Sequence, residues 1–308
     1  MTETVLVTGG TGFVGSTLAA ALADDGHRPI ALDPSPTTDR LDRFGVADDV
    51  EVVRGDVTDL ATIARTIEEY DVNRIVHLAA LLSADVRTDE YAATRVNAVG
   101  ANVVLEAARL FAEPVERVVL ASSETVYASG SAYDPPVAED ALLRPESTYA
   151  SAKRHVECLA DAYRSEHGVS AVAIRPTGVF GPFRDGFTAF ADLFEKPAIG
   201  EPTTVRNGAT AVSWLYVDDA ADAFRRAALA ADPSYGVYNI RGEVATVRRA
   251  AELVEAETGV PIDVLDDADE DWSAQRLSIE RARTDLGYRI GHDLPTMIEA
   301  YAEAVRCE

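Results

Sequence analysis

The sequence predicts an α/β protein built on a doubly wound parallel sheet, with a smaller C-terminal α/β domain. Three observations predict it: short apolar runs alternate with amphipathic helical patterns, a glycine-rich turn joins the first run to the first helix, and the alternation stops near residue 175. Strands joined through helices run parallel, because the crossover returns the chain to the same edge of the sheet. Helices then cover both faces.

The individual elements follow from local patterns. Strands are expected at the short apolar runs 5–8, 29–33, 50–53, 74–78, 117–121, 171–174 and 236–240. Helices are expected where apolar residues recur with helical spacing, at 16–24, 58–70, 90–111, 148–167, 218–231, 247–258 and 294–305. Residues 176–211 show little periodicity, and the acidic run 266–271 is expected to be a solvated loop.

Two domains are expected from the point where the alternation stops. Residues 1–175, with parts of 212–242, should form the first, and residues 176–308 should form most of the second. The sequence holds no repeat or low-complexity linker, so the second domain is expected to be interleaved with the first rather than tethered to it.

The charge excludes several classes of function. The chain has 52 acidic and 28 basic residues, a formal net charge of −24, and such a surface repels nucleic acid and anionic membranes. No apolar run approaches the roughly 20 residues that span a bilayer, and the N-terminus lacks the basic start of a signal peptide. The only lysines are Lys153 and Lys196. A lysine-poor polyanion predicts adaptation to high salt, because salt screens its self-repulsion.

The cysteines and histidines predict neither disulfide nor metal chemistry. Cys158 and Cys307 lie far apart and match no metal or redox spacing, so a reduced, cytoplasmic setting is expected. His155, His167 and His292 have no acidic residues at metal spacing, and no metal site is predicted. Cys158 is expected to be a small buried helix residue, and the tryptophans to anchor the core or loops, at Trp214 and Trp272.

A cofactor site is predicted from the glycine-rich turn Gly9-Gly10-Thr11-Gly12-Phe13-Val14-Gly15, which follows the first strand and opens the first helix. The glycines let the backbone approach a pyrophosphate resting on the helix N-terminus. The spacing is GxxGxxG rather than the usual GxGxxG. Asp33 ends the second strand, where a carboxylate binds the adenosine ribose hydroxyls and repels a 2′-phosphate. The pattern predicts a Rossmann domain that prefers NAD to NADP.

A catalytic centre is predicted at Tyr149 and Lys153, which are four residues apart at the start of an expected helix and share one face. A tyrosine ionises near about pH 10, and an ammonium beside it is expected to lower that pKa. Ser123 follows the strand that ends at Ala121, at the sheet edge where open α/β folds bind ligands. Its hydroxyl could hold the substrate oxygen while Tyr149 exchanges a proton.

With these motifs the sequence resembles the extended short-chain dehydrogenases/reductases, the NAD-dependent epimerase/dehydratase family. The segment from Thr8 to Gly15 is similar to TGGTGFxG, Tyr149 and Lys153 to YxxxK, and residues 175–182 to RPxNVYGP. Further similar segments are 55–57, 77–80, 96–97, 122–127, 216–219 and 285–288.

The resemblance implies a catalytic triad of Ser123, Tyr149 and Lys153, with NAD as cofactor. It implies that Asn97 shapes the nicotinamide end of the site, and that helices 90–111 and 148–167 form the four-helix bundle of a homodimer. The implied cofactor-binding residues are Gly9, Thr11, Gly12, Phe13, Val14, Gly15, Asp33, Asp56, Val57, Leu78, Ala79, Ala80, Asn97, Tyr149 and Lys153.

The chain departs from nucleotide-sugar members of that family where they bind the diphosphate. Gly178 replaces the asparagine of RPxNVYGP, Val212 stands where relatives carry an arginine, and a late arginine has no counterpart in the acidic run 266–271. A dianion needs paired donors, so these departures favour a small polar substrate. Arg206 and Arg276 remain candidate replacements.

The dehydratase branch is disfavoured as well. Its catalytic glutamate is Thr125 here, and Glu124 is expected to point away, because neighbouring side chains alternate along an extended segment. Residues 77–84 resemble the same stretch of short-chain-type L-threonine dehydrogenases. Those enzymes and uronate dehydrogenases tend to have glycine near the position of Gly178.

The leading hypothesis is an NAD-dependent oxidoreductase acting at a secondary alcohol of a small polar substrate, a sugar, sugar acid or hydroxy amino acid. One alternative is a nucleotide-sugar 4-epimerase with tightly bound NAD, which would show no net NADH production. The other is a non-catalytic NAD-binding protein, and the intact Ser123, Tyr149 and Lys153 argue against it.

Overall fold

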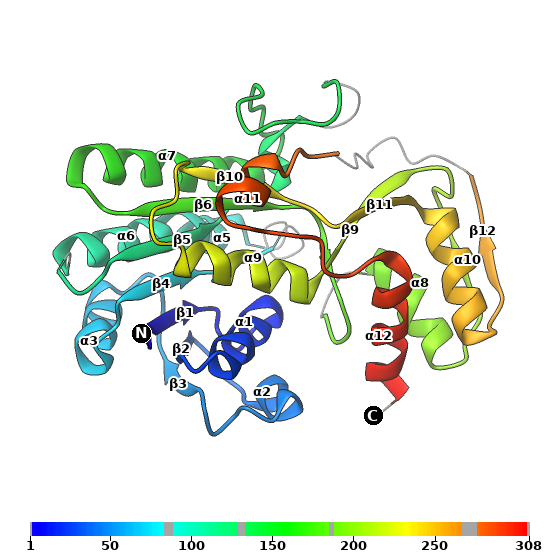
Figure 1. The fold of residues 1–308 in the computed structure, drawn as a ribbon, viewed down its shortest axis with the longest axis horizontal. Coiled ribbons are helices and arrows are strands. Elements are labelled where there is room, and N and C mark those ends of the chain that lie inside the picture. The colour runs from blue at the N-terminus through cyan, green and yellow to red at the C-terminus, as the bar shows by residue number, and fades with distance from the viewer. Residues whose placement is uncertain are drawn as a thin grey trace.

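The computed structural model describes residues 2–82, 89–111, 113–128, 133–184, 188–266 and 276–306, with the backbone alone at 188–191. Figure 1 shows a large sheet with helices on both faces, and a smaller assembly of strands and helices beyond one end of its strands. Residues 267–271, Trp272 and Cys307 lie outside the described residues, so the structure does not test what was expected of them.

The large sheet confirms the doubly wound fold. Its strands run in the order β10-β6-β5-β4-β1-β2-β3, and every neighbouring pair is parallel. The order reverses between β1 and β4, which is where such sheets bind ligands. The strands are β1 Thr4–Thr8, β2 Arg28–Asp33, β3 Glu51–Arg54, β4 Arg74–His77, β5 Arg117–Ala121, β6 Ala171–Pro176 and β10 Val237–Ile240.

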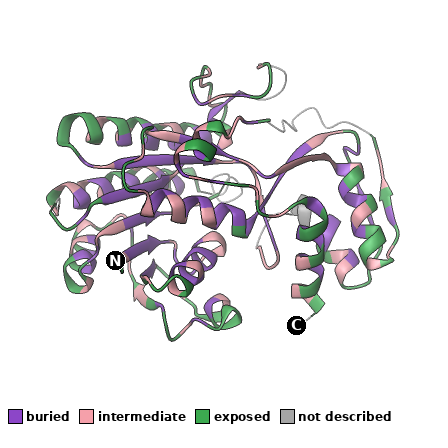
Figure 2. Cartoon of the chain, viewed as in Figure 1, coloured by how far each residue is buried: buried purple, intermediate pink, exposed green. Residues whose placement is uncertain are grey.

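Helices cover both faces because alternate strand residues point to opposite sides. Val5 and Val7 of β1 pack with α1 (Phe13–Asp24), α9 (Val217–Leu229) and α11 (Glu280–Asp285). Leu6, between them, packs with α3 (Leu60–Tyr70), α6 (Gly100–Leu110) and α7 (Thr148–His167). Figure 2 shows the strands as buried and the outer helix surfaces as exposed.

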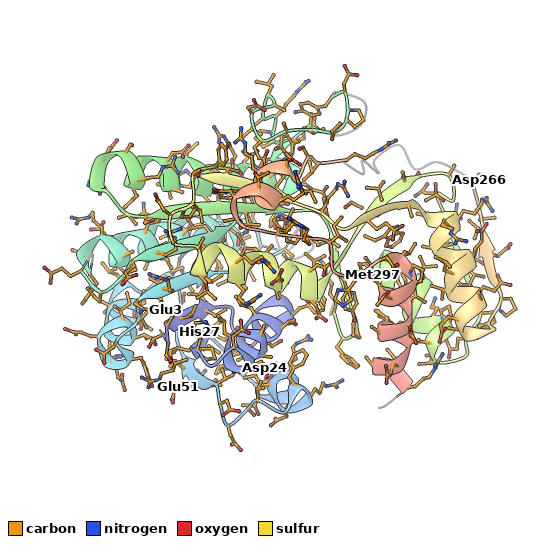
Figure 3. The ribbon with its side chains drawn as sticks, viewed as in Figure 1. Glu3, Asp24, His27, Glu51, Asp266 and Met297 are labelled. Atoms are coloured by element: carbon orange, nitrogen blue, oxygen red, sulfur yellow. The ribbon has the colours of Figure 1, made fainter. Side chains whose placement is uncertain are left out.

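The smaller assembly has its own apolar core. It holds the sheet β11-β9-β7 and the pair β12-β8, and Trp214 lies in its core fully buried, as expected. Met297 of α12 is buried there too (Figure 3). The elements are β7 Val179–Phe180, α8 Thr188–Ala198, β8 Thr203–Val205, β9 Ala211–Tyr216, β11 Glu243–Thr246, α10 Val247–Thr258, β12 Ile262–Val264 and α12 Leu294–Arg306.

The chain enters the smaller assembly at β7, returns to the large sheet through α9 and β10, and leaves again at β11. Residues 212–242 therefore contribute to both bodies. This path supports the proposed division into residues 1–175 with parts of 212–242, and 176–308.

Three local expectations need correction. The helix expected at 90–111 is three pieces: α5 (Glu90–Thr94), one π-helical turn η1 (Arg95–Val99) and α6. Cys158 is exposed rather than buried, because it lies on the outer side of α7. Three helices lie where none was expected, α2 (Asp39–Phe44), α8 and α11. Tertiary packing stabilises α8, because Leu193 and Phe194 are buried in the smaller core.

Candidate active site

The glycine-rich turn joins β1 to α1 and leaves the helix N-terminus open. Gly9 has a φ of 70°, in the left-handed region, and its N–H donates to Leu32 O at 2.8 Å. A side chain at Gly15 would collide with the carbonyl oxygen of Gly9, so the helix packs directly on the turn. Gly12 is the N-cap of α1, and no side chain in the described structure caps that helix. Backbone N–H groups at an uncapped N-terminus suit a phosphate, so these residues fit the pyrophosphate of NAD.

The part of the predicted cofactor site that would hold the adenosine lies at the carboxyl ends of β2 and β3. Asp33 ends β2, and its Oδ1 accepts a hydrogen bond from Ser35 N at 3.2 Å. Gly55 N donates to Asp33 O at 3.0 Å, which brings the following residue, Asp56, to the same edge. Asp56 Oδ1 accepts from Thr58 N at 2.8 Å, and Val57 is buried beside Gly100. The carboxylate of Asp33 therefore lies at the carboxyl end of β2, where NAD-binding folds hold the ribose.

Asn97 fixes the backbone that follows β4. Its Oδ1 accepts from Leu81 N at 2.8 Å, and its Nδ2 donates to Leu81 O at 2.8 Å. The π-helical turn that carries Asn97 directs this amide at the segment holding Leu78, Ala79 and Ala80. π-Helical turns occur frequently at functional sites. Asn97 thus fixes the backbone of Leu81, and its predicted role at the nicotinamide end would act through that backbone.

Ser123, Tyr149 and Lys153 converge where β5 ends and α7 begins. Ser147 Oγ caps α7 by accepting from Ala150 N at 3.1 Å, which places Tyr149 in the first turn. The Ser123 side chain is hydrogen-bonded to Tyr149. Lys153 is buried, and its Nζ donates to Ala121 O at 2.9 Å. The structure brings together all three residues that the sequence predicted, and their catalytic roles stay a prediction.

The electrostatics of Tyr149 differ from the sequence-based expectation. Burial raises the pKa of Tyr149 to about 12, and the hydrogen bond with Ser123 and the charge of Arg184 oppose that rise. Burial also lowers the pKa of Lys153 to about 8. Lys153 was expected to lower the pKa of Tyr149. Burial outweighs any such effect, because the Lys153 ammonium is directed at Ala121 O. Arg184, whose Cζ lies 5.8 Å from the Phe13 ring centroid, was missed by sequence reasoning.

Glu124 does not point away from the site, so that expectation is wrong. Residues Glu124–Val126 form a single 3₁₀ turn, η2, rather than an extended segment. The turn directs the side chain to Gly178, whose N–H donates to Glu124 Oε1 at 3.0 Å. Burial raises the pKa of Glu124 to about 8. A carboxyl group therefore lies at the position where relatives carry the asparagine of RPxNVYGP.

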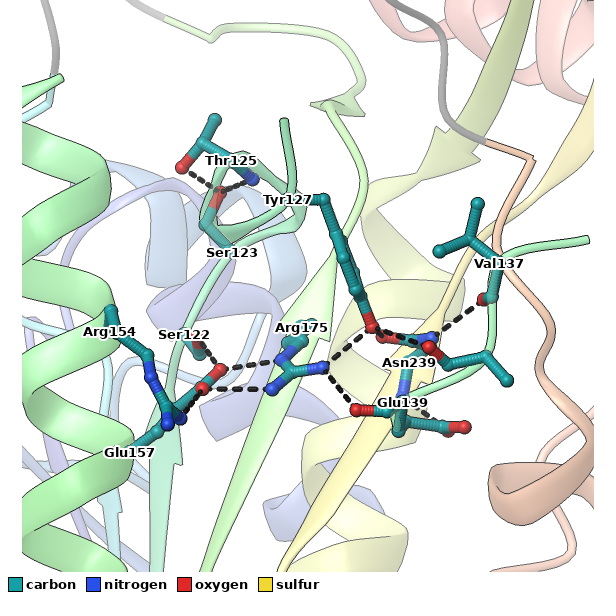
Figure 4. Close-up of polar contacts among 11 residues, drawn as sticks. Ser122, Ser123, Thr125, Tyr127, Val137, Glu139, Arg154, Glu157, Arg175 and Asn239 are labelled. Atoms are coloured by element: carbon teal, nitrogen blue, oxygen red, sulfur yellow. Dashed lines mark hydrogen bonds and ion pairs between the residues drawn. The ribbon is translucent and has the colours of Figure 1, made fainter. Parts of the chain in front are cut away.

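A buried ion pair holds α7 against the sheet beneath these residues (Figure 4). Glu157, four residues after Lys153 on α7, is fully buried. It accepts from Arg175 Nε at 2.6 Å and from Arg175 Nη2 at 2.9 Å. Ser122, directly before Ser123, donates to the same carboxylate at 2.6 Å. The pair thus links α7, β5 and β6 at the level of the predicted triad.

The network continues to β10. Arg175 Nη1 donates to the Tyr127 hydroxyl at 2.6 Å, which donates to Asn239 Oδ1 at 2.9 Å. Asn239 N donates to Glu139 Oε1 at 2.9 Å. Sequence reasoning did not single out these residues, although Glu157 continues the four-residue spacing of Tyr149 and Lys153.

The positions that lack diphosphate donors are also placed by the structure. Val212 is buried in the smaller apolar core, so this position presents no charge. Arg206 and Arg276 are exposed, and Arg276 borders a cavity of about 720 Å³ whose lining includes none of the predicted triad. Asp266, which begins the acidic run, pairs with Arg248 at 2.7 Å on the outer side of the smaller assembly (Figure 3).

Within the described residues, no group of three or more histidine, cysteine or acidic side chains could hold a metal ion. No described helix is long and apolar enough to cross a membrane.

Comparison with known proteins places this site in a family. The model of the NAD dependent epimerase/dehydratase family matches residues 5–240. The chain is 36% identical over 231 residues to a UDP-glucose 4-epimerase of Mycolicibacterium smegmatis, covering 72% of each protein. The fold matches a Thermus thermophilus UDP-glucose 4-epimerase complex with NAD, at 27% identity, 99% coverage of both chains and a TM-score of 0.82. It also matches a partial consensus L-threonine 3-dehydrogenase, at 24% identity, 99% and 100% coverage and a TM-score of 0.86.

Proposed function

Because the chain belongs to the NAD-dependent epimerase/dehydratase family of extended short-chain dehydrogenases/reductases, we propose that it transfers hydride between NAD and a secondary alcohol of a small polar substrate in the cytoplasm. The substrate would be a sugar, a sugar acid or a hydroxy amino acid. The substrate size is argued from three positions where nucleotide-sugar relatives are expected to carry anion-binding side chains or a neutral site. Gly178 carries no side chain and bonds the carboxyl group of Glu124 instead, and Val212 lies in an apolar core.

The residues divide the chemistry between them. NAD supplies the hydride acceptor when it is bound. Ser123 holds the substrate hydroxyl beside Tyr149, which takes the proton from that oxygen as general base. Lys153, held by Ala121 O, adds positive charge under the site. Arg184 favours the phenolate of Tyr149.

A second candidate is a nucleotide-sugar 4-epimerase that retains NAD, and the likeness to the Mycolicibacterium smegmatis protein favours it. Turnover separates the two. The dehydrogenase should accumulate NADH with one member of a panel of uronates, sugars and hydroxy amino acids. An epimerase should interconvert UDP-glucose and UDP-galactose without net NADH.

Free nucleotides give an independent test of the substrate class. UDP or dTDP at millimolar concentration should neither inhibit turnover nor raise the melting temperature beyond the effect of NAD. The reason is the missing donors, each charge-assisted bond being worth about 1.5–3 kcal/mol. Differential scanning fluorimetry measures the shift. Clear stabilisation by either nucleotide would show that Arg206, Arg276 or another arginine binds the diphosphate, and the epimerase would then be the better assignment.

We also propose a homodimer formed through the helices between residues 90 and 110 and α7. Three large apolar side chains are exposed on the first of these segments: Tyr91 (77%), Val99 (46%) and Leu110 (52%). Light scattering should give twice the 33.0 kDa chain mass, and Val99→Asp should shift the protein to monomer. Leu142→Asp, at an 80% exposed position outside these helices, is the control. A monomeric wild type would contradict the proposal.

A further inference from the structure

Glu124 lies between the predicted proton-transfer centre and the end of β6. It follows Ser123 directly, and consecutive Cα atoms are about 3.8 Å apart, so a substrate oxygen held by Ser123 brings the next substrate atoms towards the Glu124 side chain. The other end of that side chain is fixed, because Gly178 N donates to Oε1 at 3.0 Å. This contact engages Oε1, and Oε2 is the oxygen that a ligand would use.

The position is built for a carboxyl group. Gly178 has no side chain to fill the space at the end of β6, and its N–H anchors Glu124. Ser123, the residue before, is oriented by its neighbour, because Thr125 N and Thr125 Oγ1 approach Ser123 Oγ at 3.2 and 3.0 Å. Glu124 is therefore held in a fixed place relative to the serine that would hold the reacting oxygen.

The charge of this group selects among ligands. The raised pKa of Glu124 shows that its surroundings do not stabilise a bare carboxylate. An ammonium group beside it would supply that stabilisation, and a hydroxyl group could donate to Oε2.

We propose that Glu124 is a substrate-binding residue that recognises an ammonium or hydroxyl group on the carbon next to the reacting alcohol. The inference rests on the proposed hydride-transfer function and narrows its substrate class to amino alcohols and vicinal diols. It gives Glu124 no part in proton abstraction.

Paired substrates test it with the NAD-loaded enzyme. L-Threonine and 3-hydroxybutyrate differ in the ammonium group beside the alcohol, and D-galacturonate and its 2-deoxy form differ in the hydroxyl. Wild type should prefer the first member of the active pair by at least about tenfold in kcat/KM, the size of a hydrogen bond to a charged group. Glu124→Ala should remove most of that preference by lowering kcat/KM for the first member about tenfold.

Glu124→Gln separates binding from folding, because its amide oxygen can still accept from Gly178 N. It should lower kcat/KM for the ammonium substrate about tenfold and kcat/KM for the diol by less. The reason is that an amide can hydrogen-bond a hydroxyl group but cannot form an ion pair with an ammonium group. Glu139→Gln is the matched control. Glu139 is also buried and accepts a backbone N–H, from Asn239 at 2.9 Å, but it lies outside the site, so the preference should not change.

Two results would overturn the inference in distinguishable ways. If the enzyme is active but both Glu124 variants keep the wild-type preference, or lose kcat/KM equally for the two substrates, the role of Glu124 alone is contradicted. Failure of the wild type to reduce NAD with any panel member would remove the proposed function, and this inference with it.

Discussion

Tyr149→Phe should lower turnover by about 10²–10⁴-fold, the usual contribution of a positioned general acid or base, while NAD affinity stays close to that of wild type. The hydroxyl that this change removes is the one hydrogen-bonded to Ser123. The ring, which lies 5.6 Å from Lys153 Nζ, is retained. Steady-state rates with an active substrate and calorimetric titration of NAD measure the two effects separately.

Tyr163→Phe is the control for this prediction. Tyr163 lies on the same helix, but its hydroxyl bonds Glu106 of α6 at 3.1 Å, away from the predicted triad. Its loss should leave turnover unchanged. If Tyr149→Phe kept more than a tenth of the wild-type rate, Tyr149 would not be the proton-transfer group.

Glu157→Ala should lower the free energy of unfolding by about 3–5 kcal/mol, the cost of breaking a buried ion pair. Arg175 is 2% exposed and directs Nε and Nη2 at Glu157, so the change leaves its charge buried without that carboxylate. Ser122 also loses its acceptor. Equilibrium denaturation in urea measures the change.

A matched exposed pair shows whether burial is the cause. Glu252 and Arg249 lie 3.5 Å apart with both side chains 57% exposed, and Glu252→Gln should cost about 1 kcal/mol or less. The double variant Glu157→Leu, Arg175→Met should recover part of the loss, because no unpaired charge remains buried. Equal effects of Glu157→Ala and Glu252→Gln would argue against the buried pair as a main source of stability.

The strands and the cofactor turn could be predicted from sequence because their signals are local. Runs of apolar residues end where β1 and β5 end, and the cap Ser147 lies directly before α7. The glycine turn is local as well, since Gly9 needs a left-handed φ and Gly15 needs contact between helix and turn. The net charge of −24 also belongs to the sequence alone, and the salt adaptation that it implies stays a prediction.

The missed and wrong assignments all depend on distant partners. The 3₁₀ turn that directs Glu124 to Gly178 reverses the expectation from an extended segment, and its partner is 54 residues away. The π-helical turn at Asn97 interrupts a helix whose periodicity looked continuous, and it places the amide on Leu81.

The sequence by itself thus determined the doubly wound sheet, the dinucleotide turn and the identity of Ser123, Tyr149 and Lys153, because hydrophobic period and motif spacing are read along the chain. Only the tertiary structure decided that Glu157 is tied to Arg175, that Lys153 is directed at Ala121 O, and that Glu124 is bonded to Gly178. The physical reason is that a polar side chain is oriented by the donor or acceptor that satisfies it once buried, and here that group comes from a distant part of the sequence.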